Sequence, residues 1–295
     1  MNKRWNKLFL IPAFVLALLP ASAQIARIDP TLLGKATAGD VQAQYLVGQA
    51  YSQGKGAVQD YTEAVAWLQK AADQGLAQAQ FELGVLFHLG QGVPQSDERA
   101  AVWYHRAADQ GFARAQLSLG LLYDHGDGVP QDYALAAGWY RKAALQGVAE
   151  AQFNLGTCYE HGEGVPQDPS QAADLYRRAA EQGNAAAQFN LGLLYDNGQG
   201  ITKDLAQAAS WYRKAAELGV PRAQFNLGSM YAMGQGVALS YPEAWLWLDL
   251  AAANWTGAHQ EQAILARDSV AARLAAPELE TARQRSAKWQ AEHRK

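Results

Sequence analysis

The stretch of residues 151–183, AQFNLGTCYEHGEGVPQDPSQAADLYRRAAEQG, decides how this chain folds, because it recurs along the sequence with a period of 36 residues. An Ala-Gln pair opens each copy, and the copies start at Ala43, Ala79, Ala115, Ala151, Ala187 and Ala223. No insertion or deletion interrupts the period between Gly39 and Asn254. A fixed period of this length is typical of solenoids, so the sequence predicts one folding unit stacked six times.

Apolar residues within each copy follow the spacing of two amphipathic helices. In the fourth copy Ala151, Leu155 and Cys158 lie at i, i+4 and i+7, which predicts a first helix, helix A. Asp168 is a good N-cap residue for a second helix, helix B, which should bury alanines and an aromatic residue. Gly156, in the middle of helix A, has an equivalent in every copy, which indicates close contact with an aromatic ring of helix B.

A Gly-x-Gly turn separates the two helices of each copy, as in Gly162-Glu163-Gly164. Glycine adopts the left-handed conformation at a helix C-terminus more readily than other residues, so these glycines are expected to be caps. No strand precedes the turn and no Lys-Ser/Thr follows it, which excludes a phosphate-binding loop. A Lys or Arg near the end of helix B is expected to complement the helix dipole.

The N-terminal segment has the three parts of a signal peptide: basic residues, an apolar run over 8–20 and small residues before a cleavage site between Ala23 and Gln24. The run is too short to span a membrane. Without this segment the chain keeps 22 Lys+Arg against 28 Asp+Glu, a balance that argues against nucleic acid or an anionic membrane as partner. Its single cysteine allows no intrachain disulfide.

The composite pattern A-x-x-x-L-G-x-x-Y-x-x-G-x-G-V-x-x-D, followed by A-x-x-W-Y-x-x-A-A-x-x-G, resembles the Sel-one-like (Sel1-like) repeat, a relative of the tetratricopeptide repeat. The resemblance implies an all-α protein, a right-handed α-solenoid of six 36-residue antiparallel helix pairs, acting as an adaptor or scaffold in the periplasm or outside the cell. Residues 24–38 are expected to form an N-terminal capping helix, residues 39–254 the six repeats and residues 255–295 the C-terminal capping helices. Some relatives with a disulfide in each repeat have been linked to penicillin binding, but these repeats lack the cysteines.

Few residues suggest catalysis or metal binding. Cys158 occupies a position held by apolar residues in the other copies, so it is expected to be a buried, inert thiol. His125 and His161 are repeat equivalents and are expected to lie at solvated helix ends. The spacing suggests no Ser-His-Asp or Cys-His set, so the sequence predicts a protein that is not an enzyme and that has no metal or cofactor.

The face of helix A left free by the core pattern is the predicted binding surface. Asn154, Asn190 and Asn226 share one repeat position, and should form a ladder whose amides pair with the backbone of an extended peptide. This arrangement resembles the asparagine ladder of a tetratricopeptide superhelix, although asparagine could equally be a tolerated exposed helix residue. Flanking residues expected to add selectivity through charge and apolar contact are Arg114, Arg222, Leu121, Leu193 and Met233.

The sequence therefore predicts an exported, periplasmic or secreted, non-catalytic scaffold that binds a protein or extended peptide in a concave groove. One alternative is a β-lactamase or a protein that binds peptidoglycan fragments. Another is a periplasmic regulator of a membrane signalling, export or motility complex. A solenoid fold does not determine its ligand, so the sequence leaves the partner unidentified.

Overall fold

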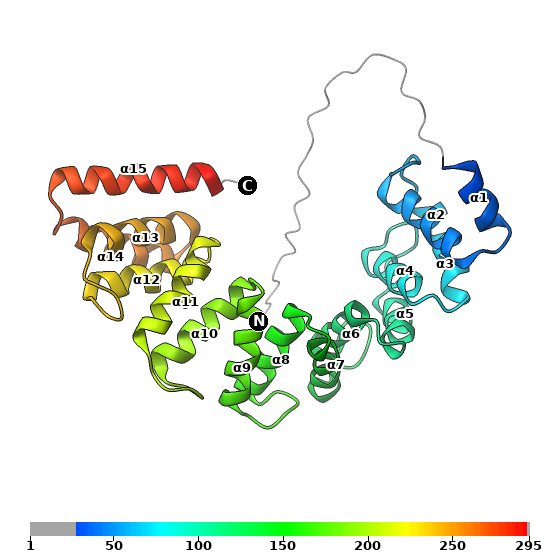
Figure 1. The fold of residues 1–295 in the computed structure, drawn as a ribbon, viewed down its shortest axis with the longest axis horizontal. Helices are drawn as coiled ribbons and strands as arrows, with labels where there is room; N and C mark the ends of the chain where they lie inside the picture. Colours follow the sequence, from blue (N-terminus) through cyan, green and yellow to red (C-terminus); the bar gives the residue numbers. More distant parts are fainter. Residues whose placement is uncertain (1–27, 294–295) are drawn as a thin grey trace, which may run out of the picture.

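The computed structural model describes residues 28–293, which form fifteen helices and no strand, arranged as an arc (Figure 1). The A helices are α2 (Val41–Gln53), α4 (Ala77–Leu89), α6 (Ala113–His125), α8 (Ala149–His161), α10 (Ala185–Asn197) and α12 (Pro221–Met233). The B helices are α3 (Tyr61–Asp73), α5 (Asp97–Asp109), α7 (Tyr133–Leu145), α9 (Pro169–Glu181), α11 (Leu205–Glu217) and α13 (Tyr241–Asn254). The ends are α1 (Pro30–Thr37), α14 (Ala258–Ala271) and α15 (Ala276–His293). The predicted all-α solenoid of six helix pairs is confirmed.

Each helix pair is joined by a close contact at the glycine of helix A. A Cβ atom added to Gly156 would lie 2.8 Å from the ring of Tyr176 on α9, so only glycine leaves room for the ring. Tyrosine fills this place in the second to fifth repeats. In the first and sixth repeats leucine does so instead, as Leu68 and Leu248. The expected aromatic contact is therefore confirmed for the four inner repeats and wrong for the two outer ones.

The two glycines of each Gly-x-Gly turn have different structural roles. The first is the predicted cap: Gly162 ends α8 with a left-handed φ of 75°. The second contacts the preceding repeat, because a Cβ added to Gly164 would lie 2.0 Å from the carbonyl oxygen of Tyr133 at the start of α7. Gly56 has the same backbone conformation, but no repeat precedes it and the space around it is open.

This difference predicts unequal costs for two identical substitutions. Gly56→Ala should lower the free energy of unfolding by about 1–2 kcal/mol, the cost of a left-handed alanine. Gly164→Ala should add about 1–3 kcal/mol to that cost, because the methyl group must also displace the neighbouring backbone. Chemical denaturation of both variants checks the difference, and equal costs would show that the turn does not need this close approach.

A row of buried glutamines connects successive repeats. The glutamine at the fourth position of each A helix donates from Nε2 to a carbonyl oxygen near the end of the preceding helix, over 3.1–3.3 Å. These residues are Gln44, Gln80, Gln116, Gln152, Gln188 and Gln224, all buried. Each of these carbonyls also accepts from the N–H of the glycine that follows the helix, so the glutamine gives it a second hydrogen bond and ties the start of one helix A to the end of the preceding helix.

In most of these glutamines the side-chain oxygen, Oε1, accepts a hydrogen bond from a second side-chain amide. In the fourth repeat Gln182, at the end of α9, donates to Oε1 of Gln152 over 2.8 Å, and four repeats share this bond. In the sixth repeat Asn254 replaces the donor. In the fifth repeat the donor position is Leu218, and Oε1 of Gln188 is buried without a hydrogen-bond partner among residues 28–293.

Replacing Leu218 by glutamine should therefore stabilise the protein. Leu218 is 58% exposed, so Leu218→Gln loses little packing and restores a hydrogen bond worth about 1 kcal/mol. The reverse substitution in the fourth repeat, Gln182→Leu, should destabilise by a similar amount because it leaves Gln152 unsatisfied. Thermal unfolding of both variants is the measurement; a lower midpoint for Leu218→Gln would contradict this account of the glutamine row.

The basic residues near the ends of the B helices stack on tryptophan. The Nζ atoms of Lys142 and Lys214 lie 3.6 and 3.7 Å from the ring centroids of Trp139 and Trp211. Residues three positions apart on a helix are neighbours, and a cation above an indole ring is stabilised by about 0.5–1 kcal/mol. The lysines thus cover the buried tryptophans, in addition to the expected favourable position near the helix C-terminus.

The two ends of the arc close the stack differently. Asp29 caps α1, whose Ala36 carbonyl accepts the amide of Gln44, so α1 takes the place of a helix B as expected. At the other end α14 continues the A series, but Ile264 stands where the repeats have their glycine, 36 residues after Gly228. The side chain of Ile264 blocks the close approach of a seventh helix B.

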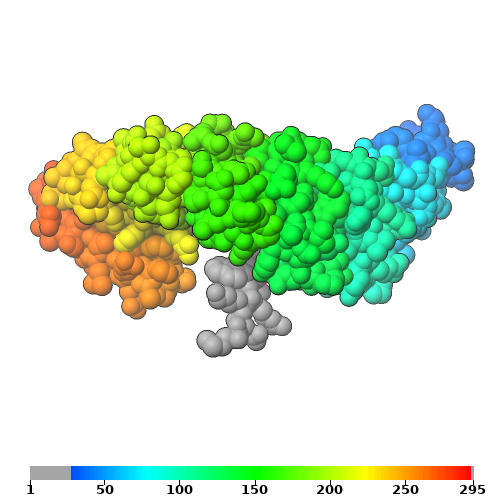
Figure 2. Space-filling view, turned by 90° about the horizontal axis from the view of Figure 1, so that it is seen from below, coloured from blue at the N-terminus to red at the C-terminus, as the bar shows by residue number. Residues whose placement is uncertain are grey.

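The last helix, α15, packs on α13 (Figure 1). Asp249 of α13 holds both final helices, because it accepts from Arg267 of α14 over 3.0 Å and from Ser286 of α15 over 2.7 Å. An aspartate at this position is a local charge reversal, since α11 has Arg213 there. Seen from below the arc, the repeats form one continuous elongated body (Figure 2).

The predicted signal peptide over residues 1–23, with its cleavage site at Ala23 and Gln24, lies outside the described residues. Within residues 28–293, no helix has the length and apolar character needed to cross a membrane.

Candidate functional site

Stacking of the repeats leaves one face of every helix A partly exposed, and we call this surface the A-face. In the fourth repeat its members are Glu150, Asn154, Thr157, Glu160 and His161, and the other repeats contribute their equivalents. In the first half of the arc α4 and α6 lie on its inner side, and α5 and α7 on its outer side (Figure 1).

The predicted asparagine ladder lies on the A-face. Asn154, Asn190 and Asn226 occupy the same turn of α8, α10 and α12, and all three are half-buried. Nδ2 of Asn154 is buried and has no hydrogen-bond partner among residues 28–293. The amides of Asn190 and Asn226 lie beside the hydroxyls of Tyr176 and Tyr212. Two residues of the ladder therefore neighbour the tyrosines of the preceding repeats.

These tyrosines bond a row of carboxylates at the ends of the A helices. The hydroxyls of Tyr140, Tyr176 and Tyr212 donate to Asp124, Glu160 and Asp196 over 3.1, 2.5 and 3.3 Å. Burial raises the pKa of each tyrosine well above its ordinary value, and the neighbouring carboxylate raises it further, so the phenols stay protonated donors. Within residues 28–293, none of the three carboxylates forms an ion pair with Lys or Arg.

The five residues predicted to flank the ladder are spread over three helices. Arg114 and Leu121 lie on α6, Leu193 on α10, and Arg222 and Met233 on α12. Both arginines are exposed, whereas the two leucines are half-buried and pack against the core. Met233 is 59% exposed and lines a pocket next to α14. The structure thus places these residues along one surface but does not gather them into one pocket.

Charge is divided unequally between the two kinds of helix. The A helices carry five carboxylates and two arginines: Glu82, Asp124, Glu150, Glu160, Asp196, Arg114 and Arg222. The B helices carry nine basic residues, Lys70, Arg99, Arg106, Arg141, Lys142, Arg177, Arg178, Arg213 and Lys214, and ten carboxylates, so their charges nearly balance. The A helices are therefore the more acidic set, most strongly at Glu150 and Glu160 of the fourth repeat, and this favours the approach of positively charged groups.

The structure confirms that Cys158 is a core residue. Its side chain is buried between α7 and α8, in one cluster with Ala136 and Leu155. Burial, reinforced by the negative charge of Asp124, raises the pKa of its thiol to about 12. A thiol is nucleophilic as the thiolate, so Cys158 is poorly suited to covalent catalysis.

His125 and His161, at the ends of α6 and α8, are exposed, as expected. Nδ1 of His125 is 3.9 Å from Asp127, and both side chains are more than half exposed. Within residues 28–293, no group of three or more His, Cys, Asp and Glu side chains is arranged to hold a metal ion.

The raised pKa of Cys158 makes a prediction about pH. The thiol ionises near pH 9 in the unfolded chain but near 12 in the native protein, so its contribution to stability is complete below pH 9 and is lost as pH rises toward 12. Cys158→Ala should therefore show a weaker loss of unfolding free energy between pH 8 and 10.5 than the wild type. In the native wild type, iodoacetamide at pH 8 should react far more slowly than in denaturant; equal rates would contradict the burial of the thiol.

Two features of the stack were not predicted from the sequence: the tyrosine–carboxylate row and the buried glutamines at the junctions between repeats. Both have a sequence signal. An acidic residue recurs 16 positions before a tyrosine, as in Asp124 and Tyr140, and glutamine follows the first alanine in every copy. Their hydrogen-bond partners lie across the helix pair or in the neighbouring repeat, so the spacing alone did not identify which residues would be in contact.

Stacked antiparallel helix pairs with one uncovered helix face define an α-solenoid repeat protein. The Sel1 repeat family matches this chain six times, over residues 41–76, 77–112, 113–148, 149–184, 185–220 and 221–254. The chain belongs to the Sel1 repeat family, as the sequence pattern predicted. Proteins of this family are generally scaffolds for protein–protein interaction.

Solved structures of several bacterial proteins are similar to this one. A Sel1 repeat protein from Oxalobacter formigenes is 32% identical, with 75% of this chain and 95% of that chain covered and a TM-score of 0.64. A protective antigen of uropathogenic Escherichia coli described as displaying an SLR fold is 27% identical, with 88% and 86% covered and a TM-score of 0.36. A Sel1 repeat protein from Klebsiella pneumoniae is 20% identical, with 82% and 98% covered and a TM-score of 0.32. No curated protein matches this chain.

Proposed function

We propose that this protein is an exported, non-catalytic scaffold that binds an extended segment of a partner protein along the A-face. The observation that carries the proposal is the polar row of the third to sixth repeats, where tyrosine hydroxyls from the B helices bond carboxylates near the ends of the A helices, along the same surface as the asparagines. Such a row suits a partner that runs along the stack and meets the same groups in each repeat.

Two features of the row define the chemistry of that partner. A side-chain amide offers a donor and an acceptor, so the asparagines suit the backbone of an extended segment whatever its sequence. Asp124, Glu160 and Asp196 each accept one tyrosine hydroxyl and keep further lone pairs, which suit Lys or Arg side chains of the partner. Neighbouring helices pack about 10 Å apart and an extended chain advances about 3.3 Å per residue, so contacts would recur about every third residue.

The triple variant Asn154→Ala, Asn190→Ala, Asn226→Ala tests the role of the ladder. It should fold normally, because alanine has the higher helix propensity, and should lose at least tenfold in affinity for the partner. The partner would be captured with wild-type protein from the extracytoplasmic fraction and identified by mass spectrometry, and its affinity for both proteins measured by calorimetry. N-terminal sequencing of the recovered protein would test the proposed cleavage before Gln24.

A matched control carries three alanines on a helix B instead. Gln207, Ser210 and Glu217 are exposed residues of α11, away from the A-face, so their replacement should leave the affinity unchanged. Unchanged affinity in the triple asparagine variant, with an intact fold, would show that the ladder is not the binding site. Hydrolysis of a chromogenic β-lactam by the purified wild type would instead favour the enzymatic alternative.

A further inference from the structure

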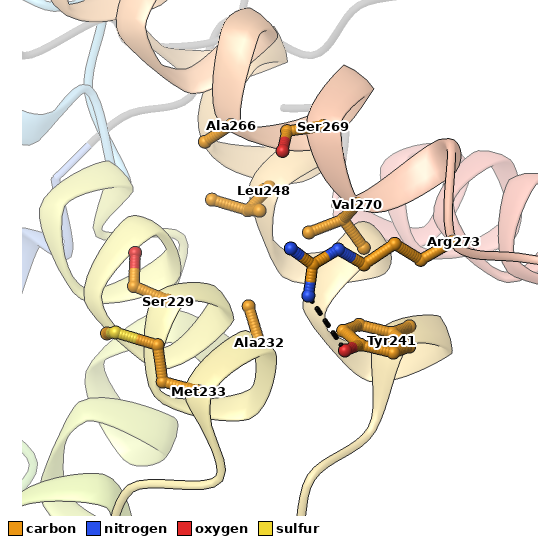
Figure 3. Close-up of a pocket in the computed structure, with 9 residues that line it drawn as sticks. All are labelled: Ser229, Ala232, Met233, Tyr241, Leu248, Ala266, Ser269, Val270 and Arg273. Atoms are coloured by element: carbon orange, nitrogen blue, oxygen red, sulfur yellow. Dashed lines mark hydrogen bonds between the residues drawn. The ribbon is translucent and has the colours of Figure 1, made fainter.

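The two ends of the A-face differ from its middle because the tyrosine that fills each inner repeat is missing there. In the inner repeats a tyrosine ring covers the glycine of helix A and reaches the A-face. Leu248 takes that place in the sixth repeat, and its side chain is smaller because it lacks the phenol ring. A pocket of about 300 Å³ opens above Leu248, between α12, α13 and α14 (Figure 3). A pocket of this size is at the small end of ligand sites and suits a group the size of one amino-acid residue.

The pocket has an apolar interior and one cation at its rim. Leu248 and Val270 line it together with Met233, while Arg273 extends across its opening (Figure 3). The guanidinium of Arg273 is held by Tyr241, to whose hydroxyl it donates over 2.9 Å and whose ring centroid lies 5.3 Å away. Within residues 28–293 Arg273 forms no ion pair.

These features select an apolar group that carries a carboxylate close to it. A guanidinium presents a planar set of donors that matches a carboxylate, and here a hydrogen bond already fixes its direction. The C-terminal residue of a polypeptide carries an apolar side chain and a carboxylate on the same Cα atom. The pocket is also continuous with the A-face, because Ser229 and Met233 of α12 belong to both.

We propose that the pocket between α12, α13 and α14 binds the C-terminal residue of a partner polypeptide, with a bulky apolar side chain over Leu248 and the carboxylate on Arg273. The nature of the occupant as a polypeptide rests on the proposed function, but recognition of an apolar carboxylate by the pocket can be tested without the partner.

The opposite end of the molecule supplies a natural control. There Leu68 leaves an equivalent pocket of about 240 Å³, lined by Tyr61 as the first pocket is lined by Tyr241. The charged residue at this second pocket is Glu82, which accepts from Tyr45 and Gln49. A carboxylate ligand is repelled there, so filling the second pocket should not affect its binding.

The test uses the full chain labelled with ¹³C at its methionine methyl groups, of which there are three, with Met233 in the pocket and Met230 in the core. N-acetyl-L-phenylalanine should shift the Met233 signal saturably. N-acetyl-L-phenylalaninamide, which lacks the charge, and a neutral-ended peptide with an internal Phe-Glu pair should each bind at least tenfold more weakly. No saturable shift with the acid, or equal affinity for any of these probes, would overturn the proposal.

Three variants locate the interaction. Leu248→Tyr fills the pocket with the residue that the inner repeats have, and should abolish the shift, whereas Leu68→Tyr at the other end should leave it unchanged. Arg273→Gln, an exposed change that does not threaten the fold, should lower the affinity for the acid at least tenfold, to that of the amide. Binding that survives Leu248→Tyr, or an affinity for the acid that Arg273→Gln leaves unchanged, would refute the assignment, and the outcome is independent of the asparagine ladder, which these probes do not reach.

Discussion

The hydrogen bond from a buried glutamine to the last carbonyls of the preceding helix is the interaction on which the solenoid depends. Helix ends are costly to bury, because their carbonyls have no partner within the helix. Here every junction between repeats buries such an end, and its carbonyl accepts one bond from the following glycine and a second from Gln152 or its equivalent in the next helix. Because the same hydrogen bond forms at every junction, further repeats can be added without new contacts. This explains how six repeats of identical length stack on one another.

Stopping such a stack requires residues that break the pattern, and the C-terminal end has three of them. Leu248 replaces the tyrosine of the inner repeats, Ile264 replaces the glycine, and Asp249 replaces the basic residue found at its position in α11. The first leaves a cavity, the second prevents a further helix pair, and the third anchors the final helices. The proposed terminal pocket is thus a by-product of the way the array ends.

The repeats allowed much of the fold to be predicted from the sequence, because each position was seen six times. The six glycines at the position of Gly156 were enough to predict a close helix contact, and apolar equivalents of Cys158 were enough to place it in the core. The surface was less predictable. The second turn glycine, Gly164, was assigned as a cap, because its contact with Tyr133 lies in another repeat. The pocket at Arg273 was missed because one of its sides, formed by α14 and Arg273, comes from a part of the chain that does not repeat.

The missing donor at Leu218 bears on how the molecule deforms. A linear array bends and opens first where neighbouring segments are coupled most weakly. The fifth repeat is the only one in which the described structure leaves the buried glutamine half satisfied. Elastic strain applied along the arc would therefore concentrate there, and the solenoid would behave as two stiffer segments joined by one compliant repeat. That compliance would let the curvature of the A-face adjust to a bound chain without disturbing either end.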